Sequence, residues 1–441
     1  MTDFINLHQA CIFLAVVALF PLANYILRRG QDPFSPFVFI GGVVFAVSDR
    51  KLLTDPAPAL NYLPEWALTE YVLITGFSLL AAYAGWHYWK RRHPIPAIAP
   101  HRPLDHYKTQ YDPNRMVVAG IIYGLVALVV FLETNNRFAV TSGYLRDLTF
   151  LSDPGAVLLI QALILDPGLF WPALFGIAAA TFRFFWGFFS YGSRGGTFEA
   201  VVLAMVPFLL RGRRPPKIPL VVVGCVLAVV LGTLAKSRSI LGNGEAPNRV
   251  AAIWVAAREM FHGGTRRYSP AVEFVVGAGE VYVVETKGNW DDGGIIWNTA
   301  VVFLPHEWFP NKADYYTEWG EGKYNGYLQQ IRRVAGVDVP LGCAPTGFAN
   351  VFVEIGWLFP VFWFLVGYAT HFIYGLAVYG KRLDHQCYLV VTMVGLLYLV
   401  TQDLNAFIFN ALLTFVPAAV AYNWCRVPAG RSAGGNPRRA G

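Results

Sequence analysis

Long apolar runs alternate with short polar stretches along most of the chain. About eleven runs read as membrane helices, at residues 4–27, 36–47, 66–89, 116–132, 156–165, 169–189, 198–210, 218–235, 351–379, 388–400 and 407–423. Several reach the roughly 20 residues that cross a bilayer, so the pattern predicts an all-α, polytopic transmembrane helical bundle. The 154–190 region also allows a re-entrant pair in place of two spans. The first run lacks a basic leader and a small-residue cleavage site, which is typical of a retained span.

One polar segment, at 237–345, interrupts this pattern. Its charged and aromatic side chains are too dense for hydrocarbon, so we expect a loop outside the bilayer. Within it, 249–261 places apolar side chains at helical spacing, which predicts an interfacial amphipathic helix. The residues of this stripe are Val250, Ile253, Trp254, Ala257 and Phe261. The predicted organisation is N-terminal transmembrane helices at 1–236, a large periplasmic loop with amphipathic helices at 237–345, C-terminal transmembrane helices at 346–425 and a disordered cytoplasmic tail at 426–441.

Basic clusters follow alternate runs, at 28–29, 90–92, 211–217, 381–382 and in the tail. Such clusters mark the cytoplasmic side, which places the amino terminus and the long loop on the opposite face. The net charge of +7 therefore sets topology and does not indicate a nucleic-acid partner.

Composition agrees with a membrane chain and limits its chemistry. Only 14% of residues are charged, whereas a soluble protein would have about 25%. Four of the five cysteines lie in or beside apolar runs, and there is no CxxC, HExxH or GxxxxGK[ST] pattern. The sequence therefore predicts neither a disulfide framework nor a metal, a cofactor or an ATP-driven step.

Two arginines near membrane helices are candidates for binding an anion. Ser193 and Arg194 lie in a glycine-rich turn, where backbone can approach a phosphate and a guanidinium can grip it in a fork. The alternative is a tight turn with a snorkelling arginine. Arg183 lies inside the aromatic run 169–189, where an arginine marks either a function or a satisfied ion pair.

The loop and the helix after it carry further candidates. Arg266 and Arg267 could clamp a pyrophosphate or an anionic sugar, the alternative being a solvated pair beside Glu273 and Glu280. His306, beside a carboxylate, could be a general base, or merely a polar loop residue. The polar entry to the run 351–379 could present a helix amino terminus to an anion. Glu354 near that entry is costly unless paired or hydrated, so we expect it to face a cavity.

Three segments together resemble the bacterial oligosaccharide repeat-unit polymerases, the Wzy-type O-antigen polymerase family. Residues 190–195, Ser-Tyr-Gly-Ser-Arg-Gly, are similar to the family's Ser-Gly-Ser-Arg-Gly turn. Residues 304–312, Leu-Pro-His-Glu-Trp-Phe-Pro-Asn-Lys, resemble its Ile-Pro-Arg-x-x-Trp-Pro-x-Lys-Pro element. Residues 345–357 are similar to the Gly-x-x-Glu-x-Tyr-x-x-Phe-Gly start of the helix after the loop. The chain departs from the family at His306, usually arginine, at Ala313, usually proline, and at Asn350, more often glutamate.

The resemblance implies a GT-C-like bundle in the bacterial inner membrane and a glycosyl transfer at its outer face. The donor would be a glycan on undecaprenyl diphosphate and the acceptor the next lipid-linked repeat unit, used to build O-antigen or exopolysaccharide without a metal or a nucleotide sugar. The expected catalytic residues are His306, Arg194 and Arg266, and the expected substrate-binding residues are Arg267, Arg183, Ser193, Lys312 and Glu354. A chain-length regulator as a further partner stays open.

Two other functions remain as alternatives. One is a polysaccharide ligase on the same scaffold, and the other is a flippase or transporter of lipid-linked oligosaccharide, which is not an enzyme. A transporter typically has inverted repeats and charges along a midplane path, and the sequence shows neither clearly.

Overall fold

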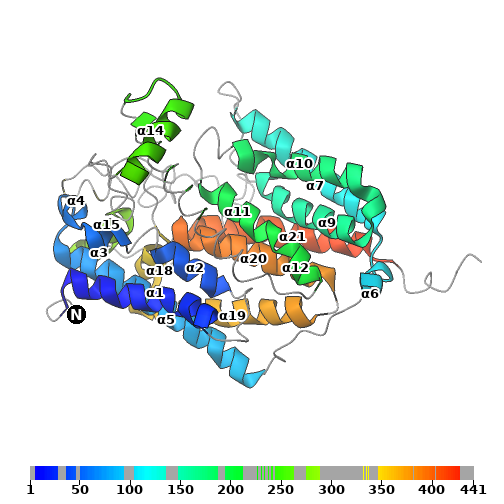
Figure 1. Ribbon diagram of the computed structural model, residues 1–441. Coiled ribbons are helices and arrows are strands. Elements are labelled where there is room, and N and C mark those ends of the chain that lie inside the picture. The colour runs from blue at the N-terminus through cyan, green and yellow to red at the C-terminus, as the bar shows by residue number, and fades with distance from the viewer. Residues whose placement is uncertain are drawn as a thin grey trace, which may run out of the picture. The chain divides into compact units, whose positions relative to one another are not determined.

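The computed structural model describes the greater part of the chain (Figure 1). The described residues are 5–27, 36–45, 50–93, 104–135, 148–186, 194–211, 226, 230, 233, 237, 240–241, 244–262, 275–288, 331, 334, 336, 346–380, 382–402 and 404–427. Among them the regular structure is helical, and an isolated backbone bridge joins Tyr111 to Arg426. The prediction of an all-helical chain is confirmed for this part of the protein.

Seven helical segments are long and apolar enough to cross a membrane. They are Leu7–Leu27, Glu65–Arg92, Pro113–Glu133, Leu148–Leu165, Pro167–Trp186, Gly347–Tyr379 and Leu383–Thr401. Each coincides with a predicted run, and the region 154–190 contributes two of them. These helices indicate a multi-pass membrane protein. The total of about eleven spans and the side of the membrane on which each loop lies stay predictions.

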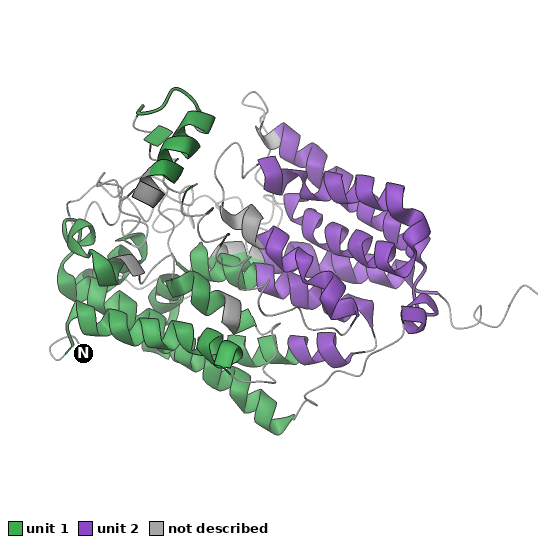
Figure 2. Ribbon diagram, viewed as in Figure 1, with its two compact units in different colours: residues 1–94, 221–372, 395–409 green, residues 95–220, 373–394, 410–441 purple. Residues whose placement is uncertain are grey.

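Contacts divide the chain into two compact units (Figure 2). Unit 1 comprises residues 1–94, 221–372 and 395–409, and unit 2 comprises residues 95–220, 373–394 and 410–441. Three helices, α19 (Phe359–Tyr379), α20 (Leu383–Thr401) and α21 (Leu404–Cys425), contribute residues to both units.

Unit 1 is built around α5 (Glu65–Arg92), which packs against α1 (Leu7–Leu27), α15 (Val275–Lys287) and α18 (Gly347–Ile355). Its shorter helices are α2 (Pro36–Val44), α3 (Arg50–Thr54), α4 (Ala57–Leu60) and the 3₁₀ turn η8 (Gly356–Leu358).

Two glycines bring α5 and α19 into backbone contact. A Cβ at Gly85 would meet the carbonyl oxygen of Phe364, and a Cβ at Gly367 would meet that of Ala82. Close approach through small residues is how membrane helices associate without a hydrophobic driving force between them.

Unit 2 contains α6 (Leu104–Lys108), α7 (Pro113–Asn135), η3 (Leu148–Leu151), α9 (Ser152–Leu165), η4 (Pro167–Leu169), α10 (Phe170–Trp186), α11 (Arg194–Ala204) and α12 (Val206–Leu210). Helices α7, α9 and α10 pack against one another. The last turns of α7 and α10 meet through the rings of Phe131 and Phe182, 6.2 Å between centroids. The first turn of α9 meets the last turn of α10 through Arg183 and Asp153. Helix α9 therefore runs opposite to α7 and α10, as successive membrane spans do.

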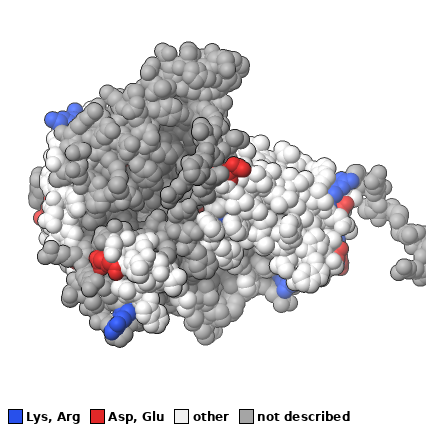
Figure 3. Space-filling model, turned by 90° about the horizontal axis from the view of Figure 1, so that it is seen from above, with Lys and Arg blue, Asp and Glu red and all other residues white. Residues whose placement is uncertain are grey.

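The outer face of α7 is apolar and exposed. Val118, Ile122, Leu125, Val129 and Leu132 recur every three or four residues and are all exposed, so they form one stripe along the helix. On the face seen in Figure 3, the described surface is largely uncharged, with a few scattered charged groups. A continuous apolar surface of this kind on a water-soluble protein would be a liability, whereas a helix in lipid requires it.

In the described part of the segment at 237–345, one of the helices was predicted from the sequence and another was not. Helix α14 (Arg249–His262) confirms the predicted helix. Val250 and Trp254 on its apolar stripe are 77% and 74% exposed, while Ala252 and Ala256 pack against Ile240 and Ala246. Val250 and Trp254 of the stripe thus lie away from the residues packed against α14, and contact of this helix with a membrane surface stays a prediction.

Helix α15 was not anticipated. Nine of its thirteen residues, from Val275 to Val284, are buried. This part of the long segment is therefore a core element of unit 1, because α15 packs against α5 and α18.

Candidate functional site

The predicted site residues are only partly described. Ser193, Arg266, Arg267, His306 and Lys312 lie outside the described residues. Arg194 is the first residue of α11. Arg183 and Glu354 are described with their side chains, Arg183 in unit 2 and Glu354 in unit 1.

Arg183 contacts two carboxylates and a hydroxyl. Its Nη2 lies 3.1 Å from Asp153 Oδ1 and 2.7 Å from Glu199 Oε2. Its Nε donates to Ser152 Oγ at 2.6 Å. Both carboxylates are almost fully buried, and the guanidinium is only 13% exposed. One guanidinium thus joins the first turn of α9, the last turn of α10 and the second turn of α11.

Local helix electrostatics favour this arrangement. Asp153 lies in the first turn of α9, where the helix dipole stabilises a negative charge, and Arg183 lies in the last turn of α10, where it stabilises a positive one. The rings of Phe150 and Phe184 flank the guanidinium, at 5.6 and 4.7 Å from their centroids. A buried charge needs such partners, because removing it from water without them is costly.

These contacts favour the ion-pair alternative for Arg183. A diphosphate approaching the guanidinium would have to displace a carboxylate that already uses the same nitrogen. It would also meet the negative charge of the displaced group. Asp153 Oδ2 is buried and has no hydrogen-bond partner among the described residues, and the contacts of this carboxylate with Arg183 and Ser152 are made through Oδ1. Direct binding of substrate by Arg183 stays a prediction.

A second buried polar cluster lies in unit 1 and includes Asn350 of the third family-like segment. The Asn350 amide nitrogen donates to Glu280 Oε2 at 3.0 Å, and its carbonyl oxygen accepts from the Leu404 backbone N–H at 3.1 Å. Glu280 and Asn350 are fully buried. Asn350 therefore ties α18 to α15 and to the first residue of α21. Because Glu280 is buried in α15, it is not part of a solvated surface pair.

The amino terminus of α18 adds two hydroxyls to the polar groups of unit 1. Tyr71 Oη and Thr346 Oγ1 lie 3.0 Å apart, and both side chains are buried. Thr346 directly precedes α18, and Tyr71 comes from α5. Hydroxyl side chains commonly form hydrogen bonds between membrane helices, so this pair ties the start of α18 to α5.

Glu354 lies at a break in the helix that the sequence predicted as continuous. Helix α18 ends at Ile355, and Gly356 has φ 56° and ψ −139°, a conformation that favours glycine. Helix α19 then begins at Phe359. Glu354, which is nearly fully buried, is thus in the last turn of α18 and not at a helix entry. Its carboxylate lies at the negative end of the α18 dipole, so that dipole does not stabilise it.

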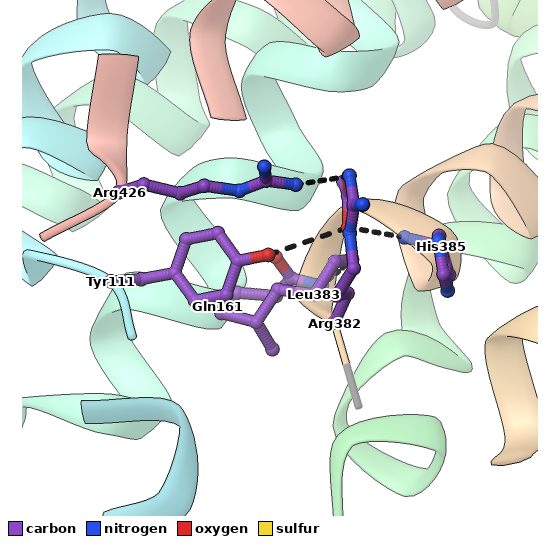
Figure 4. Close-up of polar contacts among 7 residues, drawn as sticks. Tyr111, Gln161, Arg382, Leu383, His385 and Arg426 are labelled. Atoms are coloured by element: carbon purple, nitrogen blue, oxygen red, sulfur yellow. Dashed lines mark hydrogen bonds and ion pairs between the residues drawn. The ribbon is translucent and has the colours of Figure 1, made fainter. Parts of the chain in front are cut away.

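A third polar group, in unit 2, is centred on the carboxylate of Asp384 (Figure 4). It pairs with Arg382, accepts from Arg426 Nη2 at 3.2 Å and accepts from Tyr111 Oη at 3.3 Å. Burial, followed by the nearby Asp384 charge, raises the pKa of Tyr111. Hydrogen bonding to Asp384 raises the pKa of Arg382.

The Asp384 group connects segments that are distant in sequence. Backbone hydrogen bonds from Asp112 N–H to the Cys425 carbonyl and from Val427 N–H to the Gln110 carbonyl run alongside it, both within 3.0 Å. Gln161 donates to the Leu383 carbonyl at 3.3 Å, which places this group at the far end of α9 from Asp153. The sequence indicated Arg382 and the tail arginines as topology signals but gave no sign of the shared carboxylate.

Comparisons of the chain with protein-family models, with curated proteins and with solved structures found no match. Among the described residues, no group of three or more His, Cys, Asp or Glu side chains could hold a metal ion. The class defined by the described structure is a multi-pass, all-helical membrane protein.

Proposed function

We propose that this protein is a glycosyltransferase of the repeat-unit polymerase type. It joins oligosaccharide repeat units that are linked to undecaprenyl diphosphate, at the outer face of the bacterial inner membrane. The observation that carries the proposal is the ordered resemblance of three segments, 190–195, 304–312 and 345–357, with the longest loop between the first and the last.

The position of the first segment supports the proposal. The family-like turn at 190–195 ends in the first residues of α11, whose initial residue is Arg194. The first N–H groups of a helix have no partner within the helix, and the dipole adds positive charge there. A helix amino terminus that begins with an arginine is therefore suited to a phosphate group.

The position of the last segment also fits. Residues 345–357 include all of α18, which carries the buried Asn350 and Glu354 and packs against α15 from the long segment. The segment therefore joins the loop to the membrane helices through polar contacts inside unit 1, as expected of residues that hold a reaction centre beside a bundle.

The chemistry needs little from the protein beyond orientation and charge. The acceptor hydroxyl attacks the anomeric carbon of the donor, and the bond from that carbon to the phosphate oxygen breaks. Undecaprenyl diphosphate leaves, and the hydroxyl proton passes to a base, for which His306 is the candidate. Arg194, Arg266 and Arg267 would stabilise the charge that develops on the leaving diphosphate. Losing one such donor costs about 2.7–4 kcal/mol of barrier, or about 100- to 1,000-fold in rate.

Deletion of the gene tests the proposal. A polymerase mutant accumulates single repeat units, transferred or still on the carrier lipid, and makes no long chains. A ligase mutant keeps long chains on the carrier lipid, and a flippase mutant retains single units on the cytoplasmic side. Either of the last two results would refute the proposal.

The variant Arg194→Ala, made in otherwise wild-type cells, tests whether Arg194 binds the diphosphate. It should abolish long chains while the amount of protein in the membrane stays unchanged. Continued synthesis of long chains by this variant would show that Arg194 does not clamp the diphosphate.

A further inference from the structure

Arg183 lies close to the proposed anion site along the chain, yet its contacts are with carboxylates. Glu199, which shares its Nη2, comes five residues after Arg194 on α11. Five residues correspond to about 7.5 Å along a helix axis. The ion pair therefore holds α11 less than two turns from its first residue.

The charges of Arg183 and Glu199 would also affect how tightly an anion binds at the amino-terminal end of α11. Because Glu199 is about 7.5 Å along the helix axis from the first residue of α11, an uncompensated carboxylate there would repel a diphosphate bound at that helix end, and the repulsion is large where water is excluded. Arg183 lies against Glu199 at 2.7 Å and so compensates this charge. It also contacts Asp153 and Ser152 of α9, so it cannot turn toward another anion without breaking those contacts.

We infer that Arg183 is a positioning residue: through Glu199 it fixes the start of α11, and it neutralises the carboxylate beside the anion site expected there. This inference rests on the proposed function, and it changes the role that the sequence suggested for Arg183. Ser152, Asp153 and Glu199 hold the Arg183 side chain in place and so share its positioning role.

Three variants distinguish positioning from direct contact with substrate. Glu199→Gln keeps an oxygen that accepts from Arg183 but removes one negative charge. It should bind a diphosphate about threefold to tenfold more tightly, as expected for one charge at about 8 Å and an effective dielectric constant of about 30–60. Arg183→Met should bind it at least about tenfold more weakly, because it loses the compensating charge and frees α11.

The double variant Arg183→Met/Glu199→Gln supplies the decisive comparison. If Arg183 acts through Glu199, removing both charges returns affinity toward the wild-type value. If Arg183 contacts the diphosphate itself, the double variant stays as weak as Arg183→Met.

The measurement is the dissociation constant of undecaprenyl diphosphate for the purified full-length protein in detergent, with thermal unfolding recorded for each variant. Arg426→Met is the matched control, because Arg426 also pairs with a nearly buried carboxylate of unit 2, Asp384. It should lower the unfolding temperature without changing the dissociation constant.

Unchanged or weaker binding by Glu199→Gln would overturn the inference, even if Arg183→Met fails to fold. A wild-type protein that does not bind undecaprenyl diphosphate at all would instead refute the proposed function, so the two failures are distinguishable.

Discussion

Two fully buried asparagines with opposite hydrogen-bonding states allow a sharp test of the packing in this protein. Asn350 makes two hydrogen bonds, one to the Glu280 carboxylate and one from the Leu404 backbone N–H. Asn410 is equally buried, and in the part of the chain that the structure describes neither atom of its side-chain amide has a hydrogen-bond partner. Replacing each by alanine removes the same atoms, so the difference between the variants reports the hydrogen bonds.

The expected magnitude follows from the partners. An ordinary hydrogen bond contributes about 0.5–1.5 kcal/mol net, and a buried donor left without a partner costs about 1–3 kcal/mol. Asn350→Ala should therefore lower the free energy of unfolding by about 1.5–4.5 kcal/mol, in addition to the cavity term. Asn410→Ala leaves a cavity of the same kind, but it also removes a buried amide that has no partner. It should therefore cost at least about 2 kcal/mol less than Asn350→Ala.

The assay is reversible unfolding of the purified protein in mixed detergent micelles, followed by tryptophan fluorescence for the wild type and both variants. Equal losses of stability in the two variants would refute the reasoning, because they would show that the Asn350 bridge adds nothing beyond the volume of its side chain.

Three further predictions concern packing and charge. Gly367→Val should destabilise the α5–α19 contact by at least about 2 kcal/mol, measured by thermal unfolding, because the Ala82 carbonyl occupies the space a Cβ would need. Asp384→Ala should cost about 3–5 kcal/mol by removing the carboxylate shared by two arginines, whereas Arg426→Ala, with its side chain 36% exposed, should cost about 1 kcal/mol in the same assay. Tyr111→Phe should lower stability by about 1 kcal/mol. Because the pKa of Tyr111 is raised from 10.0, its contribution is complete below pH 10 and is lost as pH rises through the folded-state pKa, which unfolding measured between pH 7 and 11 would show. A pH-independent difference between Tyr111→Phe and wild type would contradict that last expectation.

The membrane helices could be predicted because hydrocarbon imposes a length and an apolar composition on any span. The runs that became α5, α7 and α10 show this directly. Helix α15 was missed because its 13 residues include Glu280, Glu285 and Lys287 and follow a highly charged stretch. The partner of its buried Glu280 is Asn350, which lies 70 residues further along the chain.

The break at Gly356 was also missed, because apolar residues continue on both sides of it and hydropathy does not report a single backbone torsion. The ion pairs of Arg183 could be predicted only in part. An arginine in an apolar run requires a partner, but composition cannot identify Asp153 and Glu199 among the available carboxylates, since that choice depends on how three helices pack. Arg266 and Arg267 of the proposed diphosphate clamp and His306, the candidate base, lie outside the described residues, so their roles stay predictions.

The glycine contacts between α5 and α19 restrict how these two helices can move against each other. Gly85 meets the Phe364 carbonyl, and one turn away Gly367 meets the Ala82 carbonyl, so main chain touches main chain at two successive points. Sliding of one helix along the other would bring these main-chain atoms into overlap, so we expect α5 and α19 to move together. Any rearrangement inside unit 1 is then expected at helix contacts other than that between α5 and α19.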